Sequence, residues 1–123
     1  AIVLSLSVPV WAGIDEGVAA LERGDYATAL QEFRPLAEQG DAGAQINLGV
    51  MYGDGRGVPQ DYVQAHMWFS LAASRSSPGL RIPSKHRDDA VKNRDIIAAR
   101  MTPAQIAEAQ RLAQEWMEKH GKQ

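Results

Sequence analysis

Apolar positions in this chain recur every three or four residues after residue 13, which is the spacing of one face of an α-helix. In residues 24–40 a tyrosine, an alanine, a phenylalanine and a second alanine follow at such intervals, and residues 60–76 repeat the series. Alternating patterns typical of strands are weak, whereas Ala, Leu, Gln, Glu and Arg, which favour helices, dominate. The pattern predicts an all-α chain.

The two patterns are copies of each other at an offset of 36 positions. The matching pairs are Asp25 with Asp61, Tyr26 with Tyr62, Ala29 with Ala65, Phe33 with Phe69, and Ala37 with Ala73. Five identities at one offset rarely arise by chance, so the sequence predicts a helical repeat protein. In each copy a shorter helix precedes this one, so each copy is predicted to be a helical hairpin.

The second copy is the more complete. Its first helix is predicted to place Leu48 and Tyr52 on one face, with Gly49 beside them. A residue without a side chain at that position allows the partner helix to approach closely. We therefore expect Gly49 to lie in the contact between the two helices of this hairpin.

A glycine-rich connection joins these two helices. Gly53 is predicted to end the first helix in a left-handed cap, and Gly55 and Gly57 are predicted to let the backbone turn back. Asp61 is expected to place a negative charge in the first turn of the second helix. A phosphate loop is disfavoured, because no strand precedes the glycines and no Lys-Ser or Lys-Thr pair follows them. A calcium loop is disfavoured because Arg56 occupies a ligand position.

Fifteen positions of the second copy together form a longer motif. They are Ala42, Ala44, Gln45, Leu48, Gly49, Tyr52, Gly55, Gly57, Val58, Asp61, Ala65, Trp68, Phe69, Ala72 and Ala73. This motif resembles the Sel-one-like repeats, a family related to the tetratricopeptide repeats, and the match over residues 41 to about 76 is highly specific. The resemblance implies a short right-handed α-solenoid of about three helix-turn-helix hairpins.

The hairpins are expected at about residues 14–40, 41–76 and 84–120, in a single domain that spans residues 13–123. The first hairpin resembles a shorter, tetratricopeptide-like copy. Pro35 lies inside its second helix and is expected to kink or break that helix, because proline lacks a backbone donor and clashes with the preceding turn.

The third hairpin departs most from the motif. Its first helix is predicted over residues 84–101, with Ala90, Ile97 and Met101 facing inward. Its second helix is predicted to begin with a capping box formed by Thr102 and Gln105. An apolar stripe follows, made of Ile106, Ala109, Leu112, Ala113 and Trp116. We expect this helix to cap the solenoid with its polar face toward water.

Residues 1–12 contain no charge and are largely apolar. They end in Val10-Trp11-Ala12, which resembles the cleavage site of a secretory signal peptide. We interpret them as the remnant of such a signal, which predicts export to a periplasm or secretion. The alternative is an apolar element of the domain. Where the segment is retained, it is expected to pack on this chain or a neighbouring copy, which offers a route to self-association.

Composition narrows the chemistry that the chain can carry. Its 123 residues include no cysteine, and its net charge of −2 gives no overall attraction to nucleic acid. His66, His86 and His120 lack the spacing of a metal site, although His86 beside Asp88 and Asp89 leaves weak metal binding open. The usual catalytic motifs are missing from the sequence. We therefore expect no enzymatic activity, no metal and no cofactor.

Resemblance to tetratricopeptide-type solenoids implies an adaptor that binds a partner peptide or domain on a concave face lined by the first helix of each hairpin. The positions that match this face are Gly43, Ile46, Asn47, Val50, Asn93 and Arg94. Asn47 stands where related repeats hold a peptide backbone or a terminal carboxylate. Arg94 is expected beside it, where it would pair with a carboxylate. With the export signal, this predicts an interaction module of the bacterial cell envelope.

Two other functions stay open at this point. One is a hydrolase or binding protein that acts on cell-wall material, which a deep pocket with convergent polar groups would favour. The other is a subunit of a larger complex, whose groove is filled at all times.

Overall fold

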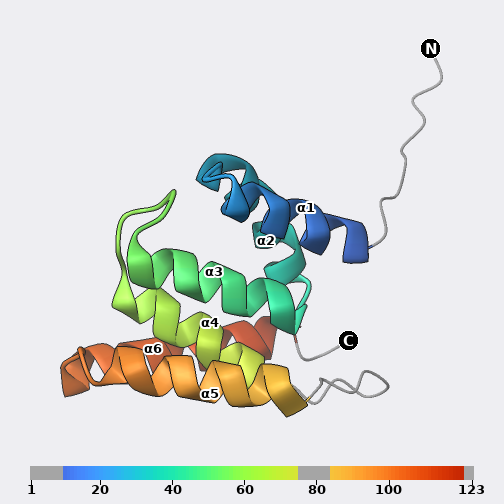
Figure 1. The fold of residues 1–123 in the computed structure, drawn as a ribbon. Helices are drawn as coiled ribbons and strands as arrows, with labels where there is room; N and C mark the ends of the chain where they lie inside the picture. The colour runs from blue at the N-terminus through green and yellow to red at the C-terminus, as the bar shows by residue number, and fades with distance from the viewer. Residues whose placement is uncertain (1–9, 75–83, 121–123) are drawn as a thin grey trace.

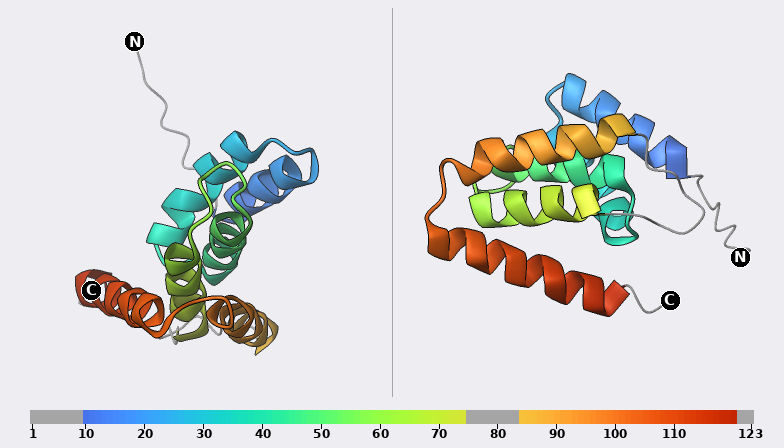
Figure 2. Two further views of the ribbon diagram at one scale, coloured as in Figure 1. Left: turned by 90° about the vertical axis from the view of Figure 1, so that its left-hand side faces the viewer. Right: turned by 90° about the horizontal axis from the view of Figure 1, so that it is seen from below.

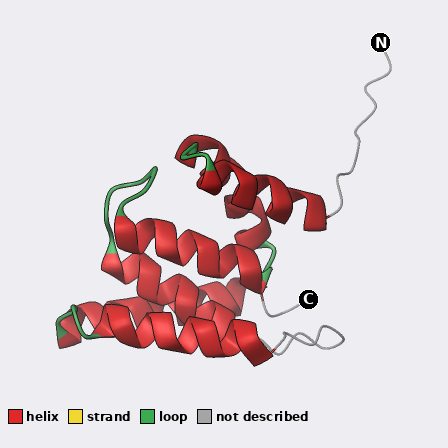
Figure 3. Ribbon diagram, in the orientation of Figure 1, coloured by secondary structure: helices red, strands yellow, loops and turns green. Residues whose placement is uncertain are grey.

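The structure is a computed structural model that describes residues 10–74 and 84–120. These residues form six α-helices, and no strand occurs among them (Figure 1, Figure 3). The helices are α1 (Val10–Glu22), α2 (Tyr26–Glu38), α3 (Ala42–Asp54), α4 (Tyr62–Ser74), α5 (Ser84–Ala98) and α6 (Pro103–His120). The all-α prediction is confirmed.

The helices stack as consecutive hairpins in two layers. Figure 2 shows α1, α3 and α5 on one side of the molecule and α2, α4 and α6 on the other. The closest packing joins α1 to α2, α2 to α3, α3 to α4, and α4 to both α5 and α6. This arrangement, in which each hairpin packs mainly on its neighbour, is that of an α-solenoid.

Three aspartates determine where helices begin. The side chains of Asp25, Asp41 and Asp61 each accept a hydrogen bond from the backbone N–H three residues further on, at 3.2, 2.8 and 3.1 Å. These are N-cap bonds, which satisfy donors that have no partner inside the helix. Asp61 therefore stands just before α4, and not in its first turn as predicted.

The glycines between α3 and α4 differ in role from the prediction. Gly53 lies inside α3, so the prediction that it ends the helix is wrong. The left-handed cap falls on Gly55, with φ 68° and ψ 40°. Because α3 continues past Gly53, this buried glycine meets α5: a Cβ atom there would lie 3.3 Å from Cδ1 of Ile97. Gly57, with φ 75°, packs against Tyr26 of the first hairpin.

The same contact closes each of the first two hairpins, between a glycine on the first helix and a phenylalanine on the second. A Cβ atom at Gly49 would lie 2.7 Å from the ring of Phe69, and one at Gly17 would lie 2.5 Å from the ring of Phe33. A Cβ atom almost never comes so close to another heavy atom, so glycine alone fits these positions without movement. This is the close contact expected of Gly49.

The equivalent role of Gly17 was missed in the sequence. The two glycines are 32 positions apart, whereas the two phenylalanines are 36 apart. A single repeat offset therefore cannot align both partners of the contact. A search of the first helix of each hairpin for a glycine that can face the matching phenylalanine of the second helix would have found it.

The helix α2 continues through Pro35 to Glu38, so of the kink or break expected there, the break does not occur. Phe33 and Ala37, two residues to either side, are both completely buried. This packing holds the last turn in helical form although the proline cannot donate a hydrogen bond. The turn is closed by the N–H of Gln39, which donates to the carbonyl oxygen of Pro35 at 3.0 Å.

The third hairpin is built differently, because α5 and α6 flank α4 and join different core clusters. The helix α6 adds Ala113 and Trp116 to the main core. The helix α5 adds Ile97 to a smaller cluster that also contains Ala65 and Phe69 of α4. Figure 2 shows the two helices diverging from the turn that joins them. The partner against which α6 packs is therefore α4.

Most local predictions for this hairpin are correct, although α5 ends at Ala98 and not at Met101. Ala90 and Ile97 are buried, and the half-buried Met101 packs on the smaller cluster. At the start of α6, the N–H of Gln105 donates to Oγ1 of Thr102 at 3.1 Å, and the N–H of Thr102 donates to Oε1 of Gln105 at 2.9 Å. This is the predicted capping box.

The first helix begins at Val10, three residues before the expected start of the domain. Residues 1–9, which make up most of the expected signal remnant, lie outside the described residues, as does the segment 75–83. Export and the packing of residues 1–12 therefore stay predictions. Within the described part of the chain, no helix combines the length and apolar character needed to cross a membrane.

Candidate functional site

Two of the residues expected on the concave face, Ile46 and Val50, are half-buried on α3. They pack against the smaller core cluster of Ala65, Phe69 and Ile97. These two side chains therefore hold α5 in place, and only part of their surface is available to a partner.

The half-buried amide of Asn47 is held by its own helix. Its Nδ2 donates a hydrogen bond to the carbonyl oxygen of Gly43, one turn earlier, at 2.9 Å. An amide has two N–H donors and an acceptor oxygen, so this single bond leaves capacity for bonds to a peptide. Gly43, another residue expected on this face, is the acceptor that orients the amide.

On α5, Asn93 is half-buried. The sequence offset that aligns Asn93 with Asn47 also aligns Ala90 with Ala44, and both of these alanines are completely buried. The adjacent Arg94 points about 100° away around the helix. Arg94 was expected beside Asn47, but it lines a hollow whose other walls are α4 and α6. Sequence alignment thus placed Arg94 on the correct helix, but in the structure its side chain lines this hollow and not the surface around Asn47.

The hollow between α4, α5 and α6 has a volume of about 520 Å³, within the usual range for ligand pockets. Its polar lining consists of His66, Ser70 and Ser74 of α4, Arg94 and Asp95 of α5, and Gln110 of α6. Ala113 and Met117 of α6 add an apolar wall. We call this space the α4–α6 hollow.

The residues inside the third hairpin explain why the hollow exists. In the alignment of α3 with α5, Arg94 and Asp95 stand where α3 has Leu48 and Gly49. Leu48 is completely buried and Gly49 touches Phe69, so these residues close the second hairpin. A charged pair at the same positions would lose its hydration if α6 packed over it, which is costly. The helix α6 instead packs on α4 and leaves the charged pair accessible.

His66 is the most buried polar residue of the hollow, with 4% of its surface exposed. Its Nδ1 lies 3.3 Å from Oγ of Ser70, one turn further along α4. Burial, followed by the positive charge of Arg94, lowers the pKa of His66 below its ordinary value, and Asp95 opposes this to a smaller extent. The lowered pKa favours the neutral form of His66. A lone histidine in a helical pattern carries no motif, so the sequence could not assign it to a site.

The His66–Ser70 pair lacks the arrangement of a catalytic base and nucleophile. In such pairs a third group orients the histidine. Among the residues that line the hollow only Asp95 carries a carboxylate, and this side chain is 66% exposed and pairs with Arg94 at 3.5 Å. A histidine with a lowered pKa is also a weaker proton acceptor. The hollow therefore suits binding better than catalysis.

Metal binding finds no support in the arrangement of acidic and histidine side chains. Across residues 10–74 and 84–120, no three such side chains converge in a way that would hold a metal ion. His86 and Asp89 are half-buried and Asp88 is exposed, all near the start of α5.

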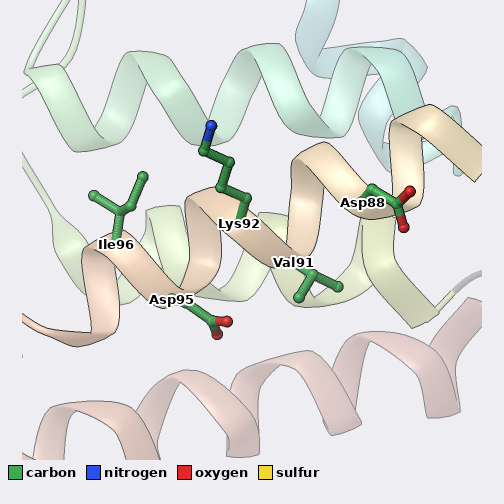
Figure 4. Close-up of a pocket in the computed structure, with 5 residues that line it drawn as sticks. All are labelled: Asp88, Val91, Lys92, Asp95 and Ile96. Atoms are coloured by element: carbon green, nitrogen blue, oxygen red, sulfur yellow. The ribbon is translucent and has the colours of Figure 1, made fainter.

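A second hollow, of about 610 Å³, lies along α5 alone (Figure 4). It is lined by Asp88, Val91, Lys92, Asp95 and Ile96. In Figure 4, Lys92 points toward α3, whereas Asp95 points toward α6. Since a single helix supplies all of its lining, this hollow is an open surface of α5.

Aromatic rings join α6 to α4. Trp68, only 6% exposed, meets Trp116 edge to face, with ring centroids 6.4 Å apart and planes at 69°. Trp116 also stacks on His120 with a centroid distance of 4.0 Å. Trp68 is thus a core residue, and Trp116 fixes α6 on α4.

These features define the class of protein. Consecutive α-helical hairpins that pack on one another, with glycine contacts and capped turns at repeated positions, make an α-solenoid repeat protein. The model of the Sel1 repeat family matches residues 42–77, which contain α3 and α4. Together with the structural likeness given next, this match supports a Sel1-like repeat protein, as the sequence motif predicted.

One solved structure extends the likeness beyond the matched repeat. It is that of a protective antigen present in uropathogenic Escherichia coli strains, which displays an SLR fold. The match has a TM-score of 0.76 and 32% sequence identity over 91% of the present chain. The present chain spans only 23% of that protein's length. No curated protein matches the chain. Sel1-like repeats generally mediate protein–protein interaction, and their fold is typically a non-catalytic scaffold.

Proposed function

We propose that this chain is a non-enzymatic interaction module of the bacterial cell envelope, which binds a partner peptide or domain on the concave face of α3 and α5. The observation that carries the proposal is the geometry of Asn47. Its amide is fixed by the bond to Gly43 and stands between the half-buried Ile46 and Val50. A fixed amide on a partly apolar surface suits the backbone of an extended peptide, because it offers both a donor and an acceptor.

The location in the cell envelope depends on residues 1–12. Their uncharged, apolar sequence and their Val10-Trp11-Ala12 end support export, to a periplasm or to the outside. The same segment would allow two copies to associate if it is retained, because its apolar side chains favour a protein surface over water. Neither property is needed for the concave face to bind a partner.

The rival function, a protein that hydrolyses or binds cell-wall material, would use the α4–α6 hollow. This hollow does gather polar groups, which favours the rival more than a flat surface would. However, Asp95 is largely exposed and paired with Arg94, so it is not placed to orient His66. We therefore prefer the interaction module.

The proposal is tested by measuring a partner's affinity. The chain is immobilised, a protein is captured from periplasmic extract and identified by mass spectrometry, and its dissociation constant is then determined by calorimetry. Asn47→Ala is expected to raise this constant about five- to tenfold, because one or two hydrogen bonds are lost. The matched control, Gln31→Ala, removes an exposed amide from α2 and is expected to have no effect.

Circular dichroism of both variants checks that the helices are intact. If Asn47→Ala binds like the unchanged chain while Gln31→Ala binds weakly, the partner occupies the side of the second helices, and the concave face is not the site. A groove that is filled at all times would show itself as a partner that co-purifies in equal amounts with the chain.

A further inference from the structure

The α4–α6 hollow is positive inside and negative at its rim. The side chain of Arg94 is 33% exposed, whereas that of its neighbour Asp95 is 66% exposed. The two are joined only loosely, at 3.5 Å between Arg94 Nη2 and Asp95 Oδ1. The guanidinium has five N–H donors, so this contact leaves most of its capacity for another acceptor.

Neutral groups from α4 and α6 surround this charge. Ser70 and Gln110 can both donate and accept hydrogen bonds, and neutral His66 contacts Ser70. Ser74 is already occupied, because its hydroxyl donates to the carbonyl oxygen of Leu71 at 3.1 Å. The remaining donors complement an anion that carries two oxygens, and a guanidinium favours a carboxylate because it can form two parallel bonds.

Beside these donors the hollow has an apolar wall. Met117 is a large hydrophobic residue that is exposed, with 41% of its surface accessible. It lines the hollow together with Ala113. An occupant that carried an apolar group next to its carboxylate would cover Met117 and gain from removing it from water.

We propose that the α4–α6 hollow is a second binding site, distinct from the concave face, that takes an acidic side chain followed by an apolar one from an extended segment of a partner protein. The carboxylate pairs with Arg94 and accepts from Ser70 or Gln110, and the apolar side chain lies on Met117. Asp95 at the rim then disfavours a second acid in the next position. A nucleic acid is a poor occupant, because one arginine next to an aspartate provides no row of positive charges for phosphates.

The test uses the full chain labelled with ¹⁵N and two capped tetrapeptides, Ala-Glu-Leu-Ala and Ala-Gln-Leu-Ala, which differ only in the carboxylate. We expect the first peptide to shift the amide signals of Ser70, Arg94 and Gln110, with a dissociation constant on the order of 1 mM for so short a ligand. The second peptide is expected to bind about tenfold more weakly, since it lacks the charge-assisted bonds.

Two variants of the chain locate the interaction. Arg94→Gln is expected to weaken binding of the glutamate peptide about tenfold. Lys92→Gln removes the same charge from the same helix, but Lys92 points toward α3 and outside the hollow (Figure 4), so binding should be unchanged. Circular dichroism confirms that both variants are folded. Asn47→Ala, which alters the concave face, should also leave this binding unchanged.

His66 gives an independent signal. The charged residues that line the hollow with His66 are Arg94 and Asp95 of α5, and the lining residues of α6 carry no titratable group. A carboxylate bound to Arg94 would offset the positive charge that helps to lower the pKa of His66. We therefore expect the glutamate peptide to raise the pKa of His66, measured by titration of its ring protons, and the glutamine peptide to leave it unchanged.

Several outcomes would overturn the proposal. Equal binding of the two peptides would mean that the hollow does not select a carboxylate. An equal loss in Lys92→Gln would mean that the charge of α5 as a whole attracts the peptide. Signals that shift around Asn47 instead of Ser70 would move the site to the concave face. Signals in the hollow that shift with protein concentration alone would show that a second copy of the chain is its occupant.

Discussion

Replacement of Gly17 by alanine is expected to lower the free energy of unfolding by about 1–3 kcal/mol, the usual cost of overpacking a core. The added methyl group would lie 2.5 Å from the ring of Phe33, which is itself completely buried in the main core. At an unhindered position inside a helix the same change raises stability by about 0.5–1 kcal/mol. The sign of the effect, read from urea unfolding, therefore separates the two cases.

A second substitution serves as the control for Gly17. If the clash is with Phe33, then the double variant Gly17→Ala with Phe33→Leu should be more stable than the sum of the two single changes predicts, because leucine leaves room for the new methyl group. A rise in stability for Gly17→Ala alone, or strict additivity of the two changes, would contradict the glycine–phenylalanine contact in the first hairpin.

The largest single loss is expected for Phe69→Ala, at about 3–5 kcal/mol, the usual cost of emptying a large aromatic site in a core. Phe69 is 2% exposed and lies in the smaller core cluster, where it contacts Gly49 and packs near Ile97 of α5. Its removal therefore loosens two contacts of α4, one with α3 and one with α5. Urea unfolding followed by circular dichroism measures the loss.

Hydrogen exchange shows which helices are affected by this change. Amides of α3, α4 and α5 should lose protection in Phe69→Ala, while those of α1 and α2, in the first hairpin, should lose least, because repeat proteins couple mainly through nearest neighbours. The matched change in the first hairpin, Phe33→Ala, should reverse this order. Uniform loss in both variants would mean that the six helices unfold as a single unit.

The sequence predicted the parts of this fold that depend on local patterns. Helical spacing of apolar residues, the repeated Asp-Tyr start of α2 and α4, and the capping box of Thr102 and Gln105 all depend on residues close together in the chain. The Sel1-like motif was readable for the same reason, because its residues lie within residues 42–77.

The errors concern contacts between distant parts of the chain. Gly53 was predicted to end α3 because glycine is a common helix terminator, but its absent side chain is used to fit Ile97, which is 44 positions later. The break expected at Pro35 does not occur because Phe33 and Ala37 are held by the core. In both cases tertiary packing outweighs a local preference. The local sequence pattern does not indicate this packing, so the sequence could not predict it.

The binding role of the candidate site residues stays a prediction, but the structure shows on which helices they lie. Asn47 is found on α3 with a fixed amide, and Arg94 is found on α5 as expected. The turning of Arg94 into the α4–α6 hollow could not be read from the sequence, because it depends on how far α6 stands from α5. The position of His66 in this hollow could not be predicted from the sequence for the same reason. The packing of Trp116 on Trp68 contributes to that distance, because it holds α6 against α4.

The central claim is that residues facing the inside of each hairpin decide whether it closes or leaves a surface for a partner. The most direct measurement compares urea unfolding of Gly49→Leu and Asp95→Leu, which change aligned positions of the second and third hairpins. We predict that Gly49→Leu costs about 1–3 kcal/mol, because Phe69 leaves no room, whereas Asp95→Leu stays within about 0.5 kcal/mol of the unchanged chain. An equal loss at both positions would show that the third hairpin is closed and that the α4–α6 hollow does not exist in solution.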